Sequence, residues 1–344
     1  MTADRKLHLF LVVHFALVCF SSTSVIGAPR PLPVMRISVE NTLSHLQTQV
    51  VKRFAGQLSE KLSGQIVVQF FPEAQLFRDK DVVSALSHDK VEMAVPGSWQ
   101  IDRFEPNVGI LLLPAFYGQS SDLNHRLLDG PFGKVLSERI EQTLQVKVLG
   151  RWIDLGHAHL YSVKHPINTP EDIAGKRIRV AGGVANALRI EAFGGLSRVI
   201  AWPDLPAKLS QGVVDGLLTT HETIASAKLW EAGIRFAFED REYFPQYVPL
   251  VNSRFWNRLS PATQTIISDT WEQQVDRARN DAAASQIAAR RLLLEHNIQI
   301  ITPADKDLRA WRERLLKGQP SMIQAMHIDP ALIPLIEKEI SLID

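Results

Sequence analysis

Arg179 is the residue whose type and position point most directly to ligand chemistry. It stands in the segment 169–183, TPEDIAGKRIRVAGG, where an expected strand, 177–180, runs into two glycines that precede a helix. Side chains alternate along a strand, so Arg179 faces away from Ile178 and Val180. Ligands of open α/β sheets bind where strands end, and a guanidinium can hold both oxygens of a carboxylate. The segment predicts a carboxylate clamp or a structural arginine paired with a nearby acid, and spacing alone favours the second.

Other polar and aromatic residues stand at the ends of expected strands. Trp202 either stacks on a ligand or packs in the core, which is the commoner role. The hydroxyl of Thr219 or Thr220 can donate to a carboxylate, but Thr220 equally suits the cap of the next helix. His157 and His159 place two imidazoles on one face of a strand. Solvated or hydrogen-bonded histidines are favoured over a metal site there, because no third ligand follows at a fixed spacing.

Catalytic motifs are missing from the sequence. It contains no Gly-x-Ser-x-Gly elbow, Walker phosphate loop, Gly-x-Gly-x-x-Gly turn or His-Glu-x-x-His pair. An enzyme acting on a carboxylate would have only Glu222, Asp204 and the pair His157 and His159 as its acid or base. No metal or other cofactor is expected.

The composition is that of a soluble globular protein. The chain has 344 residues, enough for two domains, and is 45% hydrophobic and 22% charged. Its formal net charge is only +1, without a block of like charge, which argues against nucleic acid or an anionic membrane surface as a partner.

The N-terminus has the pattern of a secretory signal. Arg5 and Lys6 precede an apolar run over 9–20, and small residues suit cleavage near Ala28. The single cysteine, Cys19, lies inside this segment without the small residue expected before a lipidated cysteine. The mature protein is therefore expected to be exported, soluble and free of thiols, and to rely on packing rather than disulfides.

Strands and helices alternate along the mature sequence. A strand over 34–39, a helix over 43–62 and a second strand over 65–71 form a βαβ unit, which implies a mostly parallel sheet. The alternation predicts further helices at 79–86, 121–143, 184–193 and 203–210, and further strands at 92–95, 146–152, 160–163, 198–201 and 214–219. A strand over 246–251 can return the chain to the first of two α/β lobes.

A long helix is expected over 261–297, which has no glycine and no internal proline. Unbroken, it would span roughly 55 Å and so brace both lobes; two shorter helices kinked near 280–284 are the alternative. A strand over 298–301 and helices over 305–316 and 330–340 complete the chain.

Five segments together resemble a known family. They are INTPEDIAGKRIRV (167–180), LSQGVVDG (209–216), FPEAQL (71–76), LPAF (113–116) and FWNRLSP (255–261). In this order they are similar to the recurring segments of solute-binding proteins of tripartite ATP-independent periplasmic (TRAP) transporters, the DctP-type family. The resemblance covers residues 36 to about 316.

The resemblance implies a fold of two α/β lobes with a hinge of crossing strands and a long helix spanning both lobes, closing on an organic anion. The first lobe is then 28–155 with about 247–280, and the second is 156–246 with about 281–320. The segment 321–344 is a C-terminal helix packed on the lobes, and 1–27 is the signal peptide.

The resemblance also assigns ligand-binding positions. Arg179 matches the family's arginine that salt-bridges the ligand carboxylate, which reverses the preference for a structural arginine, and Trp202 matches an aromatic position on the ligand. Thr219 stands where many members have asparagine. Trp99, Glu222 and His159 complete the predicted set.

The stretch Gly156-His-Ala-His159 departs from the family pattern. Many members with that asparagine also have a second ligand-facing arginine in a Gly-x-Arg segment, whose position here is Ala158 or His159, depending on register. A neutral histidine does not replace a fixed positive charge at pH 7. A monocarboxylate with an apolar or aromatic body against Trp99 or Trp202 is therefore favoured over a dicarboxylate.

The function implied is that of a monomeric periplasmic receptor that closes on a small carboxylate and delivers it to the membrane subunits of a TRAP transporter. It is expected to catalyse no reaction. Two alternatives keep the fold: a receptor that hands the closed lobes to a membrane signalling protein, and an exported enzyme acting on a carboxylate.

Overall fold

The computed structural model describes residues 31–341. The predicted signal segment and Cys19 lie outside the described residues. No helix within them combines the length and the hydropathy needed to cross a membrane.

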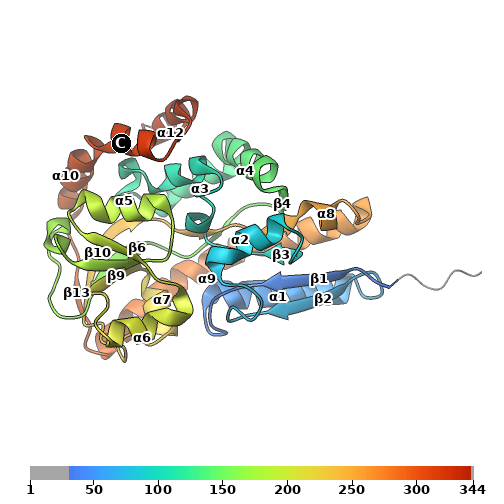
Figure 1. Cartoon of the computed structure of the whole chain (residues 1–344), viewed down its shortest axis with the longest axis horizontal. Helices are drawn as coiled ribbons and strands as arrows, with labels where there is room; N and C mark the ends of the chain where they lie inside the picture. The colour runs from blue at the N-terminus through green and yellow to red at the C-terminus, as the bar shows by residue number, and fades with distance from the viewer. Residues whose placement is uncertain (1–30, 342–344) are drawn as a thin grey trace, which may run out of the picture. The chain divides into compact units, whose positions relative to one another are not determined.

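The first of two large sheets has the strand order β2-β1-β3-β12-β4 (Figure 1). Its strands are β1 (Val34–Ser38), β2 (Val67–Phe71), β3 (Met93–Ala94), β4 (Val146–Val148) and β12 (Leu250–Asn252). The first three are parallel neighbours joined through α1 (Leu46–Lys61) and α2 (Asp79–Ser87), as the βαβ prediction requires. β12 lies antiparallel to both β3 and β4, so a late segment of the chain completes the sheet.

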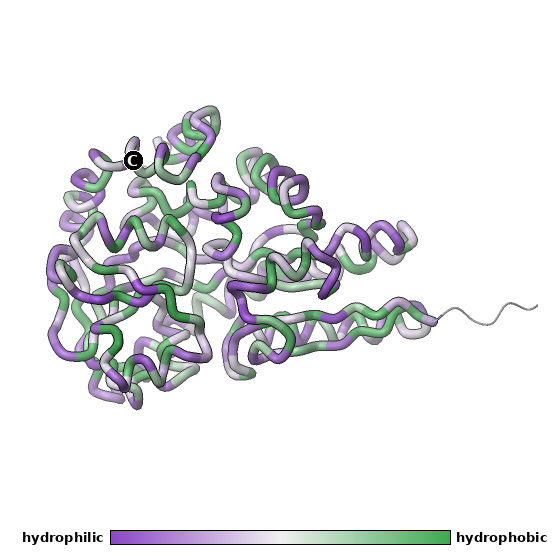
Figure 2. The backbone as a smooth tube through the Cα atoms, in the orientation of Figure 1, coloured by the Kyte–Doolittle hydropathy of each residue, from purple (hydrophilic) through white to green (hydrophobic). Residues whose placement is uncertain are grey.

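The second sheet has the order β13-β10-β6-β9-β7-β8. Its strands are β6 (Ala158–Ser162), β7 (Arg177–Val180), β8 (Leu196–Val199), β9 (Gly216–Thr219), β10 (Phe236–Tyr243) and β13 (Gln299–Ile301). β7 pairs in parallel with β8 and β9, whereas β6 is antiparallel to β9 and β10. Green, hydrophobic stretches run through both sheets and the helices packed on them in Figure 2.

Two crossing segments join the sheets. One leads from β4 to β6 through β5 (Ile153–Asp154), and the other leads from β10 to β12 through β11 (Gln246–Tyr247). β5 and β11 pair antiparallel, which confirms the predicted hinge of crossing strands. The strand predicted over 246–251 is interrupted because Pro249 has no N–H for a ladder. The predicted lobe boundaries fall in these crossings and stay a prediction.

The long helix α9 (Pro261–Glu295) is unbroken over 35 residues, about 52 Å, which excludes the kinked alternative. The side chain of Ser260 caps it by accepting from the N–H of Thr263. Its Trp271 packs edge-on against Phe54 of α1, with ring centroids 5.3 Å apart. Farther along, Gln286 donates to the carbonyl of Leu155 over 2.6 Å. Gln286 Oε1 also accepts from the N–H of Glu222 in the second lobe over 3.1 Å, so the helix braces both lobes, as predicted.

Several predicted elements differ from the structure. The helix predicted over 121–143 is two helices, α3 (Ser121–Asp129) and α4 (Pro131–Leu144), because Pro131 cannot continue a helix and starts a new one. The strand predicted over 146–152 ends at Val148. β8 begins two residues before its predicted start, at Leu196.

The remaining helices cover the sheets or end the chain. They are α5 (Val184–Ala192), α6 (Leu205–Ser210), α7 (His221–Ser226), α8 (Ser253–Trp256), α10 (Asp305–Leu316), α11 (Gln319–Ala325) and α12 (Ile333–Ile340).

Candidate functional site

Arg179 is buried at the junction of the two lobes, with only 3% of its surface exposed. Ile178 and Val180 enter the core, so Arg179 takes the opposite face of β7, as strand alternation predicts. Its Nε–H donates to the carbonyl of Ile200 over 3.0 Å. Within residues 31–341 no carboxylate lies at ion-pair distance from its guanidinium. The structure therefore gives Arg179 no acidic partner of the kind that a structural arginine has.

Trp202 lies beside this guanidinium. The centre of the guanidinium is 5.8 Å from the centroid of the indole ring, within range of a cation–π contact. Trp202 also belongs to a core cluster with Tyr161 and Leu205. Its ring thus packs in the second lobe, as the commoner of the two predicted roles requires, and also lies next to Arg179; stacking on a ligand stays a prediction.

The first lobe contributes acids and an aromatic ring that face Arg179. Burial lowers the pKa of Arg179 to about 10, while the nearby charges of Glu40 and Asp79 and the hydroxyls of Tyr243 and Tyr247 act to raise it. Glu40 is the second residue after β1, and Asp79 begins α2, where its N–H donates to Glu40 Oε1 over 3.2 Å. Burial raises the pKa of both carboxyl groups, and their mutual repulsion raises that of Asp79 further.

Trp99 forms an aromatic wall with Tyr247. The two rings meet edge to face with centroids 5.5 Å apart. The hydroxyl of Tyr247 accepts a hydrogen bond from Asn41 Nδ2 at 3.0 Å. Trp99 Nε1 is buried and has no hydrogen-bond partner in the described part of the chain. A ligand oxygen would satisfy this indole N–H.

The start of α5 packs closely against the segment that contains Trp99. Gly183 adopts φ +87°, and a Cβ there would lie 2.8 Å from the carbonyl oxygen of Trp99 and 2.9 Å from Asp102 Oδ2. Asp102 Oδ2 accepts from the N–H of Ala185, and burial raises the pKa of Asp102 to about 6. This approach requires glycine at position 183 and ties α5 to the first lobe.

Glu222 lies at a second contact between the lobes. Its Oε1 accepts from the N–H of Leu46 at the start of α1, over 3.0 Å, and its Oε2 is 3.2 Å from His45 Nε2. Burial lowers the pKa of His45, so the imidazole is neutral at pH 7. Thr220 caps α7 by accepting from the N–H of Thr223, which decides its role in favour of the helix cap.

His159 and Thr219 are ladder partners on β6 and β9. The ring of His159 lies 4.8 Å from that of His221 and 6.5 Å from that of His157, centroid to centroid. His159 Nδ1 accepts from the N–H of Arg241. Burial, reinforced by these two imidazoles, holds the pKa of His159 well below its usual value, so it is neutral at pH 7.

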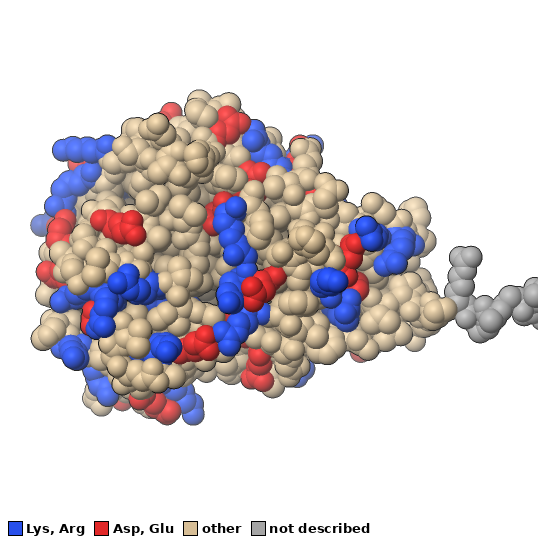
Figure 3. Space-filling view, in the orientation of Figure 1, with Lys and Arg blue, Asp and Glu red and all other residues tan. Residues whose placement is uncertain are grey.

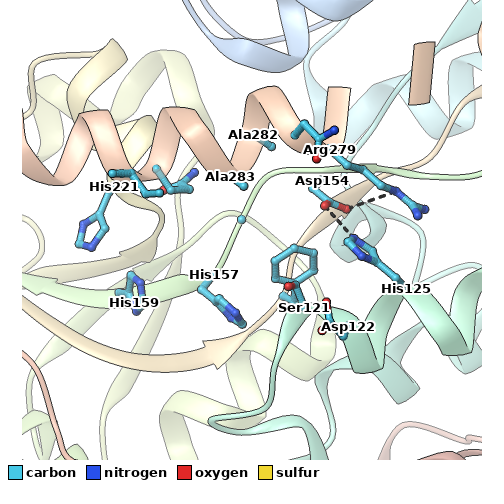
Figure 4. A pocket seen from close by; sticks show the side chains of 15 residues that line it. Ser121, Asp122, His125, Asp154, His157, His159, His221, Arg279, Ala282 and Ala283 are labelled. Atoms are coloured by element: carbon cyan, nitrogen blue, oxygen red, sulfur yellow. Dashed lines mark hydrogen bonds and ion pairs between the residues drawn. The ribbon is translucent and has the colours of Figure 1, made fainter. Parts of the chain in front are cut away.

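These histidines line a cavity of about 520 Å³ beside α9 (Figure 4). Figure 4 shows His125 and Arg279 directed at Asp154 on one side and the three histidines 157, 159 and 221 on the other. His221 is fixed between the hydroxyl of Tyr161 at 2.6 Å and Glu239 at 2.8 Å. No group of metal-holding side chains occurs among residues 31–341. Arg179 is not among the lining residues.

The structure thus brings Arg179 and Trp202 together and places Trp99 on an aromatic wall of the same junction. It gives Glu222 an interlobe contact and His159 a place in the histidine cavity. Ala158, the alternative register for a second arginine, is buried opposite Tyr243. Neither Ala158 nor neutral His159 supplies a second cation beside Arg179.

Sequence reasoning missed Glu40, Asp79 and Tyr247. Glu40 stands just past the end of β1, so the rule that ligands bind at strand ends applies to it as well as to Arg179. Tyr247 gave no such signal, because only the pairing of β11 with β5 brings it to the junction. On the face viewed in Figure 3, basic and acidic side chains are interspersed, without a field of one sign.

Comparison with known proteins identifies the family. The model of the bacterial extracellular solute-binding proteins, family 7 (DctP), matches residues 37–322. The C4-dicarboxylate-binding protein DctB of Bacillus subtilis is 24% identical over 282 residues, 81% of this chain and 78% of that protein. The 2,3-diketo-L-gulonate-binding periplasmic protein YiaO of Escherichia coli is 23% identical over 299 residues, 87% of this chain and 88% of that protein.

Solved structures show the same fold. A TRAP periplasmic solute-binding protein from Sulfurospirillum deleyianum with bound succinate has a TM-score of 0.80 and 21% identity, covering 88% of this chain and 98% of its own. The sugar acid binding protein DctPAm from Advenella mimigardefordensis, in complex with galactonate, has a TM-score of 0.82 and 19% identity, covering 90% and 98%. The match of the family model over most of the chain confirms the resemblance, and the protein belongs to family 7 of the bacterial extracellular solute-binding proteins.

Proposed function

We propose that this protein is a periplasmic receptor that binds a small organic carboxylate between its lobes and delivers it to the membrane subunits of a TRAP transporter. The observation that carries the proposal is the burial of Arg179 at the lobe junction without an acidic partner. A guanidinium removed from water needs a counter-ion, and a carboxylate fits its planar fork of donors. The bound anions of the related structures, succinate and galactonate, support this choice of ligand class.

The receptor works by closure and catalyses no reaction. Ligand that contacts both lobes stabilises the closed arrangement, which is the form that docks on the transporter. The contacts of Glu222 with Leu46 and of Gln100 with the carbonyl of Ala181 join the lobes in this closed arrangement. The protein acts as a monomer, and each molecule carries one ligand.

A thermal-shift screen of the purified mature protein against carboxylates and uncharged analogues tests the proposal. A ligand that binds only the native state raises the melting temperature by mass action. Carboxylates should shift the melt and be recovered chemically unchanged, whereas their amides should not shift it. A shift produced only by uncharged compounds, or turnover of the bound carboxylate, would contradict the proposed receptor.

A further inference from the structure

The cleft around Arg179 holds more negative charge than positive. Glu40 is 6% exposed and Asp79 is half-buried, and neither has a basic side chain at ion-pair distance within residues 31–341. Both carboxyl groups act electrostatically on Arg179. The nearby Arg78 and Asp204 neutralise each other in an ion pair of 2.6 Å. Among the described residues the junction therefore presents one cation and two carboxyl groups, none of them in an ion pair.

Burying these three charged groups costs free energy of folding unless a ligand supplies opposite charges to them. A buried charge without a partner loses its hydration and receives nothing in return. Burial raises the pKa of Glu40 and Asp79, and the charge of Glu40 raises that of Asp79 further, while the single charge of Arg179 acts to lower the pKa of both acids. A cation brought by the ligand would remove this penalty at the same time as its carboxylate satisfies Arg179.

We infer that the ligand is a zwitterion, an amino acid or related ammonium carboxylate, whose carboxylate lies on Arg179 and whose ammonium group lies against Glu40 and Asp79. This inference rests on the proposed function, because it specifies the ligand class of the same cleft. It follows from the charges of the two facing walls, one on each lobe, so that a ligand with opposite charges at its two ends ties the lobes together.

The aromatic side chains of the cleft fit the same ligand. Trp202 and the ring of Tyr247 lie on the two sides of the junction, and the faces of aromatic rings attract cations. The unsatisfied Nε1–H of Trp99 provides a donor for a ligand oxygen in addition to Arg179.

A dicarboxylate fits this cleft less well. Its second carboxylate would approach Glu40 and Asp79, which repel it or must take up a proton to accommodate it. At the two candidate positions for a second arginine the structure has Ala158 and the neutral His159, and neither offsets this cost.

Isothermal titration calorimetry of the mature protein with ligands matched in length provides the test. One series is γ-aminobutyrate, γ-hydroxybutyrate and succinate; another is β-alanine, β-hydroxypropionate and malonate; alanine and lactate form a third. In the series that fits the cleft, the amino member should bind at least about tenfold more tightly than the hydroxy acid and the dicarboxylate. Equal or tighter binding of the hydroxy acid or the dicarboxylate would overturn the inference and leave the carboxylate receptor intact.

Comparing Glu40→Gln with Glu60→Gln distinguishes the effect of the acid in the cleft from the effect of removing any one negative charge. Glu60 is exposed on α1, so Glu60→Gln should keep the preference for the amino member. Glu40→Gln should reduce that preference about tenfold or more, and a melting temperature without ligand equal to that of the parent protein shows that the variant is folded. An unchanged preference in Glu40→Gln would contradict the inference. If no carboxylate binds in these series or in the thermal-shift screen, the proposed function itself fails.

Discussion

Arg78 Nη1 donates to Asp204 Oδ2 over 2.6 Å, which links the residue before α2 in the first lobe to the segment that begins α6 in the second. A second bond, from Arg78 Nη2 to Asp204 Oδ1, makes the pair bidentate. Both residues act on the pKa of Glu40, so the pair lies near the junction that holds Arg179, and it requires the two lobes to lie against each other.

Removing this ion pair is predicted to weaken ligand binding slightly. Both side chains are close to half exposed, so solvent screens the pair and its contribution is small. Arg78→Ala should weaken affinity about two- to fivefold, mainly through faster dissociation in stopped-flow measurements. The reversed pair, Arg78→Asp with Asp204→Arg, should recover part of the loss. A double variant weaker than either single variant would show that the pair does not hold the lobes closed.

Acid is predicted to destabilise the protein through His157. Burial and the charge of Arg241 lower the pKa of His157 to about 3, compared with 6.5 for the free side chain. Between these two values the unfolded chain binds a proton that the folded chain does not. The stability due to neutral His157 is therefore complete above about pH 6.5 and is lost progressively as the pH falls toward 3.

His157→Gln should flatten the dependence of unfolding free energy on pH by up to about 1.4 kcal/mol per pH unit, measured by urea denaturation between about pH 4 and 7. His165→Gln is the control, since His165 is exposed in the connection that follows the same strand. Equal slopes for the two variants would show that His157 is not held neutral by its burial.

Trp271 is predicted to be essential for the packing of α9 against the first lobe. It is fully buried, packs on Phe54 and donates its Nε1–H to the carbonyl of Arg151 over 2.9 Å. Trp271→Ala should lower the free energy of unfolding by about 3–5 kcal/mol, as large-to-small substitutions in a core do. Ile287→Ala on the same helix, where the side chain is 58% exposed, should change it by less than about 0.5 kcal/mol. Similar losses for both would argue that α9 contributes by helix propensity and not by packing at Trp271.

The parts of the fold that local sequence signals determine were predictable. Thr169 and Asp172 form a capping box at the start of a short helical turn, Pro170–Ile173, and β7 follows this turn with Arg179 on the face opposite the core. The unbroken α9 follows from the absence of glycine and internal proline. In these cases the decisive interactions lie within a few residues of each other along the chain.

The strand β10 was not predicted, because its sequence FEDREY carries four charges in succession. Tertiary partners compensate several of them. Glu242 is buried against Arg189, whose Nε donates to it over 2.9 Å, and Glu239 pairs with Arg290 and His221. Such pairs join residues up to 53 positions apart, so no local pattern announces them.

At the lobe junction, the sequence predicted Arg179 and its neighbour Trp202 but not the residues that face them. Its facing wall consists of Glu40, Asp79 and Tyr247, which come from three separate stretches of the chain and meet only through sheet pairing and closure. The same long-range geometry directs His159 into the histidine cavity, a position that its place on β6 alone did not reveal.

The affinity of Arg179→Ala for the carboxylate identified by screening tests the central claim most directly. Loss of a buried, charge-assisted clamp should weaken binding at least about 100-fold, or about 3 kcal/mol, in isothermal titration calorimetry. Arg198→Ala is the matched control: Arg198 is the exposed ladder partner of Arg179 on β8, and its removal should leave affinity unchanged. If Arg179→Ala binds as tightly as the parent protein, Arg179 is not the carboxylate clamp, and the account of the cleft is wrong.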